Sequence, residues 1–515
     1  MDNAVYPPVV PPIVGGNEGP LGRPADREAI GANRPEELGV VTYVHTYMFS
    51  LKFLTVATLA IVAVMGFLYF LVGFPPAFDG YFAKMYFHSI GIGLAALAVY
   101  LVMQAFKLQQ YEPPIDFPIV YRAFIAVALG ALGGLVYLSP SVSNALPDVG
   151  ILLFTVAFIL IGDVGGALFL ELLLLPRKLA KSYDEQSRNV VDYIGRVLPI
   201  SKADRGAYAN VGIGYWLTLA AIASAFIAGV LGFFNLWVRV FGPSFFGGFI
   251  GWLGLDKQGW LDATLDPHSH MMALAIMAGI VAVAAVLFRV FESESPRQRV
   301  LALVGAWIAL VGVIAAPLVL GAVALLNFTP PTLFASGPGG INGMAGDDMT
   351  MAIIGAGAMI VLLAIIVERQ VWRDPLRLTV LATWVAAMII NVGQGFYIEL
   401  HEDQFSASLA ANDKSFATAQ PMTGIFLLTM LALVLLLVDV YGVAGRNRRI
   451  ATWIAALGLL GAFVGVTLWT FADPANNVIS FGIYIAGTTL SYLAVLFGAF
   501  AIRAVKVARP TPALP

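Results

Sequence analysis

Histidine and carboxylate side chains near the ends of apolar segments are the residues of this chain whose types and spacing could do chemistry. Four of the five histidines fall near the same predicted membrane face, namely His88, His268, His270 and His401. Imidazole is the commonest metal and haem ligand, and ionisable groups in apolar segments are costly. The pattern predicts a metal or haem site close to that face.

His268 and His270 form an HSH motif directly after Asp266 and Pro267. Proline favours the first turn of a helix, so we expect a helix to begin there. Residues two apart point about 200° from each other at 3.6 residues per turn, so the two rings can enter neighbouring interhelical spaces. The pair is interpreted as cofactor or metal ligands, the alternative being polar residues solvated at the interface.

His88 lies about one turn into another apolar segment and is followed by Gly91 and Gly93. Small residues let helices approach closely, or let a flat macrocycle lie against the backbone. His88 is therefore a candidate haem ligand. The alternative is a histidine that is hydrogen-bonded within the helix bundle.

His401 is flanked by carboxylates in the sequence IELHEDQ, which are Glu399, Glu402 and Asp403, and of these Glu399 and Glu402 are the candidate ligands. Imidazoles with a carboxylate suit copper or non-haem iron, so these residues could share a metal with His268 and His270. An ordinary solvated helix end is the alternative interpretation.

Two acidic residues, Asp163 and Glu171, fall inside the apolar stretch ILIGDVGGALFLELLLL. A carboxylate at the bilayer centre costs about 2.5–3.5 kcal/mol on insertion scales unless it is paired, protonated or wetted. We therefore expect either a proton route along this helix or a pairing of Asp163 with Arg122 or His45.

Composition indicates the class of protein that must position these residues. The chain of 515 residues is 59% hydrophobic and only 12% charged, with a mean hydropathy of +0.84. Soluble domains carry about 25% charged residues. The absence of cysteine excludes disulfides, thiolate-held iron–sulfur clusters and covalent c-type haem. The sequence contains no cluster of basic residues of the kind that would indicate nucleic-acid binding.

The apolar runs predict an all-α polytopic membrane bundle of about twelve transmembrane helices, because each is near the 20 residues that cross a bilayer. The expected segments are residues 51–73, 87–106, 118–138, 149–175, 211–238, 267–288, 300–326, 350–367, 378–398, 421–442, 451–471 and 478–502. An even number of crossings puts both termini on one side of the membrane.

Positive charge predicts which side that is. If the chain crosses the membrane at these twelve segments, 25 of its 29 Lys and Arg residues fall on the side of the termini. Both termini are therefore expected in the cytoplasm, and the protein in the plasma membrane. The expected organisation is a flexible cytoplasmic tail over 1–40, a transmembrane domain over 41–505 and a tail over 506–515. Within the domain we expect an outer interfacial segment at 240–266, an outer Pro/Gly loop at 328–348 and a cytoplasmic loop at 176–208.

Two short motifs resemble a known family. The string from His268 to Ala273, HSHMMA, followed by Gly279, is similar to the HxH helix of the haem-copper oxidase and nitric oxide reductase catalytic subunit superfamily. Phe82, Met85 and His88 resemble the approach to that family's low-spin haem ligand. The resemblance implies a b-type haem with His88 and one of His268 or His270 as axial ligands.

The chain also departs from that family. Its HxH pair falls on the sixth predicted helix, whereas the family has it on the tenth. The segments 300–326 and 421–442 contain no histidine, so the family's dinuclear centre cannot be assembled in its usual form.

The residues predict a membrane redox protein that binds haem, a copper or non-haem iron ion, or both. Such a protein would be an electron-transfer or oxidoreductase subunit of a respiratory complex, with quinol or a soluble electron carrier and other membrane subunits as partners. Two alternatives remain open: a proton-coupled secondary transporter that uses Asp163, and a structural subunit without redox activity.

Overall fold

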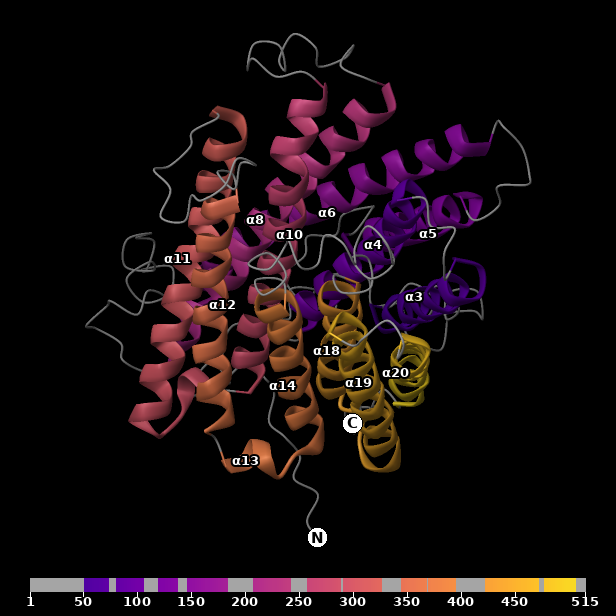
Figure 1. The fold of residues 1–515 in the computed structure, drawn as a ribbon. Coiled ribbons are helices and arrows are strands. Elements are labelled where there is room, and N and C mark those ends of the chain that lie inside the picture. Colours follow the sequence, from indigo (N-terminus) through magenta and orange to yellow (C-terminus); the bar gives the residue numbers. More distant parts are fainter. Residues whose placement is uncertain are drawn as a thin grey trace, which may run out of the picture. The chain divides into compact units, whose positions relative to one another are not determined.

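The structure is a computed structural model of the chain. It describes residues 51–73, 80–105, 119–137, 146–183, 207–241, 257–288, 290–326, 344–367, 369–394, 422–471 and 477–505. Within these ranges every regular element is a helix (Figure 1). The all-α prediction is confirmed for this part of the chain.

Nine of the described helices are long and apolar enough to cross a membrane. Three further apolar stretches are shorter, namely Met271–Leu287, Thr350–Ile366 and Pro375–Asn391. Each of the twelve predicted segments overlaps one of these stretches. Their length and composition fit an integral membrane protein, while the number of crossings and the side of the termini stay predictions.

The chain divides into two compact units. Unit 1 comprises Met1–Glu37, Val102–Arg122 and Phe158–Trp372, and unit 2 comprises Leu38–Leu101, Ala123–Ala157 and Arg373–Pro515. Three helices contribute residues to both units, and these are α4 (Gly80–Ala105), α5 (Ile119–Tyr137) and α6 (Leu146–Tyr183).

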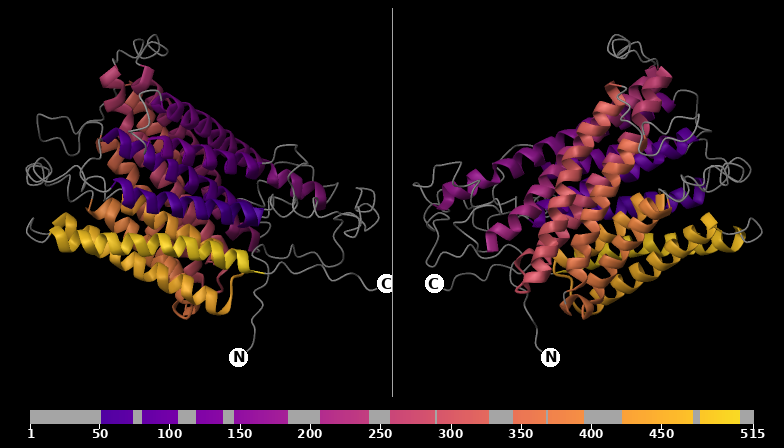
Figure 2. Two further views of the ribbon diagram at one scale, coloured as in Figure 1. Left: turned by 90° about the vertical axis from the view of Figure 1, so that its right-hand side faces the viewer. Right: turned by 60° about the vertical axis from the view of Figure 1, so that its left-hand side comes forward.

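Unit 1 is built around helices that pack lengthwise, which Figure 2 shows from two sides. Its further elements are α8 (Ala207–Phe241), α10 (Lys257–Leu287), α11 (Pro296–Leu326), α12 (Met344–Ile366) and the short α13 (Arg369–Trp372). Helix α8 packs against α10 and α11, and α12 packs against α10 and α11. An added Cβ at Gly357 of α12 would lie 2.3 Å from the backbone nitrogen of Ala309 in α11. Such close backbone approach through small residues is typical of membrane helix pairs.

Helix α10 begins earlier than the sequence pattern predicts. Its first residue is Lys257, so the expected start at Pro267 is wrong and residues 257–266 of the predicted interfacial segment are helical. The physical reason is a polar anchor, because Trp260 and Thr264 both donate hydrogen bonds to Asn235 of α8. Residues 240–241 of the same segment belong to α8, residues 344–348 of the predicted Pro/Gly loop to α12, and residues 176–183 and 207–208 of the predicted cytoplasmic loop to α6 and α8. The remainder of these three segments lies outside the described residues.

Unit 2 packs α3 (Leu51–Gly73), α14 (Pro375–Met388), α18 (Leu428–Val440), α19 (Gly445–Phe471) and α20 (Asn477–Ala504), with α20 in contact with α3, α18 and α19. Two π-helical turns, η4 (Ile389–Gln394) and η5 (Met422–Leu427), contact each other. An added Cβ at Gly424 would lie 2.2 Å from Oδ1 of Asn391, and Gln394 Nε2 donates to Thr467 Oγ1 over 2.8 Å.

One arginine joins three helix ends in unit 2. Nη2 of Arg448, in the first turn of α19, lies 2.8 Å from Oδ2 of Asp374 and 2.8 Å from Oδ1 of Asp439. Asp374 also caps α14, because its side chain accepts a hydrogen bond from the backbone nitrogen of Leu376. The arginine therefore fixes the start of α14, the end of α18 and the start of α19 together.

Replacing this arginine tests its role. We expect Arg448→Met to lower the free energy of unfolding by about 1.5–3 kcal/mol, because two largely buried carboxylates lose a charged donor. The measurement is denaturant unfolding of the purified chain in detergent. Arg446→Met is the matched control, because Arg446 is exposed and lies two residues earlier in the same first turn of α19. Equal losses in both variants would contradict the assignment.

Candidate functional site

The contact between α8 and α10 in unit 1 contains a buried histidine, His268. His268 is only 7% exposed, and its Nδ1 lies 2.6 Å from the carbonyl oxygen of Ala228. A carbonyl can only accept, so Nδ1 carries the proton and the lone pair of a neutral ring is on Nε2. The alternative that His268 is a solvated interfacial residue is wrong, because the ring is buried between two helices.

Glycine makes room for this ring. An added Cβ at Gly232 would lie 2.2 Å from Cε1, 2.6 Å from Nε2 and 2.8 Å from Nδ1 of His268. Because all three ring atoms are at similar distances, the imidazole lies with its face against the glycine. No larger residue fits at position 232 without displacing the ring.

A hydrogen-bonded cluster next to the histidine holds the two helices in register. The Asn235 side-chain oxygen accepts from Trp260 Nε1 over 2.9 Å and from Thr264 Oγ1 over 2.7 Å. All three side chains are buried. Buried polar groups at membrane depth must find partners within the protein, so this cluster is a strong constraint on how α10 lies against α8.

The contacting positions follow helical spacing on both sides. On α8, Ala228, Gly232 and Asn235 are separated by four and three residues, so they share one face. On α10 the three facing side chains are each four residues apart, and these are Trp260, Thr264 and His268. We call these six residues the polar stripe.

Among the described residues, the buried polar atoms of α8 without a hydrogen-bond partner include Ser224 Oγ, one turn before Ala228, and Asn235 Nδ2. Sequence reasoning missed Ser224 and every member of the polar stripe except His268. An asparagine within the run GFFNLW was the one available signal, because amides are rare in lipid-facing segments.

His270 follows His268 within α10, but its side chain lies outside the described residues. Glu399, His401 and Glu402 also lie outside them. Among the side chains that the structure describes, no group of three or more His, Asp or Glu residues could hold a metal ion. The metal site predicted from these residues therefore stays a prediction.

His88 belongs to unit 2, in α4, and is half-buried. Side chains of neighbouring elements fill the space beside the two glycines that follow it. An added Cβ at Gly93 would lie 2.3 Å from Val62 of α3, and one at Gly91 would lie 3.2 Å from Phe426 of η5. Close helix packing, rather than space for a macrocycle, therefore accounts for these two small residues.

Of the two acidic residues predicted to lie in an apolar helix, Asp163 forms an ion pair. Asp163 of α6 pairs with Arg122 of α5, which is one of the two partners expected from the sequence, and 48% of its side chain is exposed. Pairing removes most of the cost of a charge at this depth. Glu171 lies two turns further along α6 and is half-buried. Whether these acids conduct protons stays a prediction.

These features define a class: over the described residues the protein is all-helical, with helices that fit membrane spans and polar contacts buried between them. Comparison with known proteins adds no narrower assignment, since no family model, no curated protein and no solved structure matches the chain.

The placement of the histidine ring generates a prediction at Gly232. We expect Gly232→Ala to lower the free energy of unfolding by about 1–3 kcal/mol, because the added methyl overpacks the ring of His268. Unfolding in mixed micelles, followed by circular dichroism, measures the loss.

Gly229 of the same helix provides the matched control, because nothing lies within 4 Å of an added Cβ there. Gly229→Ala should leave stability unchanged or raise it slightly, since alanine favours the helix. Similar destabilisation by the two substitutions would show that the ring does not rest on Gly232.

Proposed function

We propose that this chain is an integral membrane redox protein in which His268 binds a b-type haem. The observation that carries the proposal is the hydrogen bond between Nδ1 of the buried ring and the Ala228 carbonyl. In metal-binding histidines, one ring nitrogen is commonly fixed by a hydrogen bond of this kind while the other binds the metal.

The donor set fits a haem better than a thiolate-held group. The chain has no cysteine, so the residues that would hold a haem iron are of other types, such as imidazole, a thioether or a phenolate. His268 would be one ligand, and the polar stripe would keep α10 from sliding along α8. A bound haem supplies one-electron chemistry.

The second axial ligand is proposed from the family resemblance, which points to His88. Its residue type and its position in α4 support His88, whereas its neighbouring glycines do not, because Val62 and Phe426 fill the space beside them. His270 is the other candidate. Copper or non-haem iron at His268, His270, His401, Glu399 and Glu402 is a further proposal that rests on sequence alone.

The proposed setting follows from the charge pattern. Both termini lie in the cytoplasm and the protein resides in the plasma membrane as part of a larger complex. Electrons arrive from quinol or from a soluble carrier. The lipid-compatible helices support the membrane setting, and the excess of basic residues near the termini supports the orientation.

Absorption spectra test the haem. The full chain, purified from a host that supplies haem, should show a Soret band that shifts on reduction, and iron analysis should give a stoichiometric content. His268→Ala should lose most of the band, because the axial ligand is gone. His88→Ala and His270→Ala, measured in parallel, identify the second ligand.

Gly229→Ala is the control for purification and should keep the spectrum of the unaltered chain. A colourless protein, or full retention of an unchanged spectrum by His268→Ala, would overturn the proposal. Elemental analysis of the same samples reports copper and iron beyond the haem content.

One observation keeps a transporter as the second candidate. The Arg122–Asp163 pair has a half-exposed carboxylate within an apolar span, where a proton-coupled carrier could protonate it. A colourless protein whose proton uptake in vesicles is abolished by Asp163→Asn would favour this function over the redox one.

A further inference from the structure

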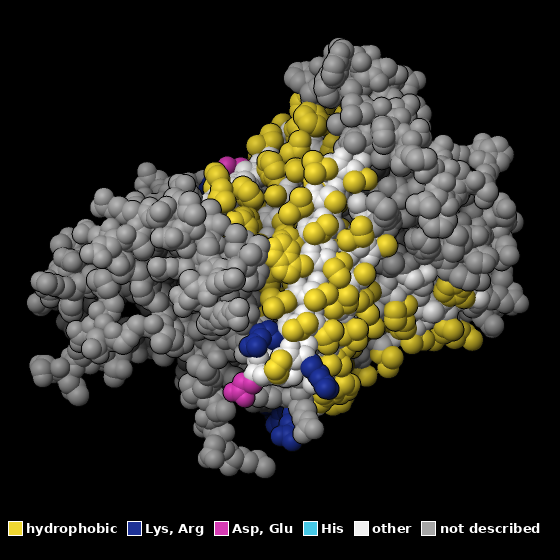
Figure 3. All heavy atoms as spheres, turned by 90° about the vertical axis from the view of Figure 1, so that its left-hand side faces the viewer, with side chains coloured by type: hydrophobic (Ala, Val, Ile, Leu, Met, Phe, Trp, Pro, Cys, Tyr) yellow, Lys and Arg dark blue, Asp and Glu magenta, His cyan; other side chains and the backbone are white. Residues whose placement is uncertain are grey.

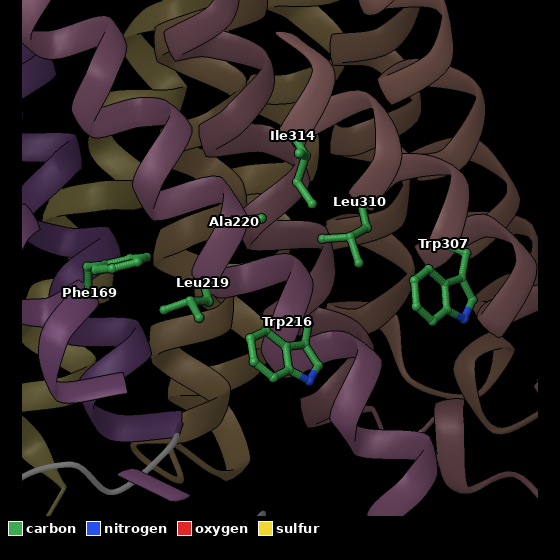
Figure 4. A pocket seen from close by; sticks show the side chains of 7 residues that line it. All are labelled: Phe169, Trp216, Leu219, Ala220, Trp307, Leu310 and Ile314. Atoms are coloured by element: carbon green, nitrogen blue, oxygen red, sulfur yellow. The ribbon is translucent and has the colours of Figure 1, made fainter. Parts of the chain in front are cut away.

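An apolar pocket of about 400 Å³ lies among α6, α8 and α11 in unit 1 (Figure 4). Its walls are carbon surfaces only. Three aromatic rings line it, Phe169 from α6, Trp216 from α8 and Trp307 from α11, with the aliphatic side chains of Leu219, Leu310 and Ile314. The volume lies within the range of about 300–1,000 Å³ that is typical of small-molecule sites.

The pocket lies at membrane depth and opens outwards. Its lining residues fall within the spans Val149–Leu173, Gly212–Val238 and Pro296–Val319. Ile314 is 51% exposed, and the outer surface of α11 continues with exposed aliphatic side chains. Figure 3 shows hydrophobic side chains over most of the described surface on that side. Water would find no hydrogen-bond partner in such a pocket, whereas a hydrocarbon chain suits its walls.

The helix directions bring three helix ends together beside the pocket. Helix α8 runs antiparallel to α6, because Tyr215 donates to the Leu172 carbonyl while Phe226, eleven residues later, contacts Gly162. Helix α10 is antiparallel to α8, and the short link after Leu287 reverses the chain again into α11. The end of α6 and the starts of α8 and α11 therefore lie at one end of the unit.

Basic residues mark that end. Arg297 is exposed and Arg299 is half-exposed in the first turn of α11, and α6 continues through Arg177 and Lys178. Glu294 is an exposed acid nearby. Arg299 precedes Trp307 by eight residues, and Arg177 follows Phe169 by eight residues. Each interval is about 12 Å along a helix, a distance that a lipid spans between its upper acyl chain and its phosphate.

We propose that unit 1 binds one anionic phospholipid, with an acyl chain in this pocket and its phosphate at the basic helix ends. The carbon-lined walls select the chain. Arg297 and Arg299 of α11 select an anionic headgroup over a zwitterionic one, as basic pockets between membrane helices do. This inference is independent of the haem.

Native mass spectrometry of the full chain tests the proposal. The protein is incubated in detergent with equal amounts of phosphatidylglycerol and phosphatidylcholine that have the same acyl chains. The unaltered chain should retain phosphatidylglycerol in preference. Ala220→Phe places a ring in the pocket, because Ala220 lines it, and should cut retention roughly tenfold by displacing about two buried methylenes.

Ile227→Phe is the matched control, because Ile227 is an exposed position seven residues further along α8 and outside the pocket. It should retain phosphatidylglycerol like the unaltered chain. The double variant Arg297→Gln, Arg299→Gln tests the headgroup separately. It should bind both lipids equally, and its sites are exposed or half-exposed, so this arm does not depend on the folding of Ala220→Phe.

Three outcomes would overturn the proposal. The first is equal retention of the anionic lipid by Ala220→Phe and by the unaltered chain. The second is equal retention of the two lipids by the unaltered chain. The third is an unchanged headgroup preference in the double arginine variant.

Discussion

The structure of unit 1 depends on how α8 and α10 satisfy buried polar groups in an apolar setting. Asn235 accepts two hydrogen bonds from α10, and one helical turn away the His268 ring rests on Gly232 and bonds to the Ala228 carbonyl. An unsatisfied amide or imidazole would cost several kcal/mol where no water can reach it. Sliding the helices by one turn would break all of these contacts together, so the polar stripe fixes a single register.

The same constraint takes a different form in unit 2. There charged side chains at helix ends supply part of the register. Arg448 joins the carboxylates of Asp374 and Asp439, and Lys52 donates to the Arg503 and Val505 carbonyls at the end of α20. Last-turn carbonyls lack intrahelical partners, so a lysine there satisfies groups that the helix leaves open. The helix faces between these ends also set the register, because an added Cβ at Gly487 of α20 would lie 2.1 Å from the backbone nitrogen of Ala462 in α19.

The helices could be located from sequence because each apolar run has the length of a membrane span. Their faces could not, because a segment that is apolar all round has no periodicity to indicate which side is buried. His268 stood out as an ionisable residue in such a segment, whereas Asn235 and Thr264 carry no charge and lie 29 residues apart. The start of α10 was misjudged for the same reason: Pro267 is a local signal, and the anchoring of Trp260 to a distant asparagine overrides it.

The two π-helical turns of unit 2 have a consequence for how this chain can change in length. A π turn is an α-helix that accommodates one extra residue, so loss of a single residue within η4 would restore regular geometry. The residues that follow would keep their faces, because the wide turn narrows to absorb the loss. Gln394 would then stay within reach of Thr467. In the regular turns of α14 the same deletion would rotate the following residues by about 100° and draw them back by about 1.5 Å, so single-residue deletions should be tolerated better within η4 than in the helix before it.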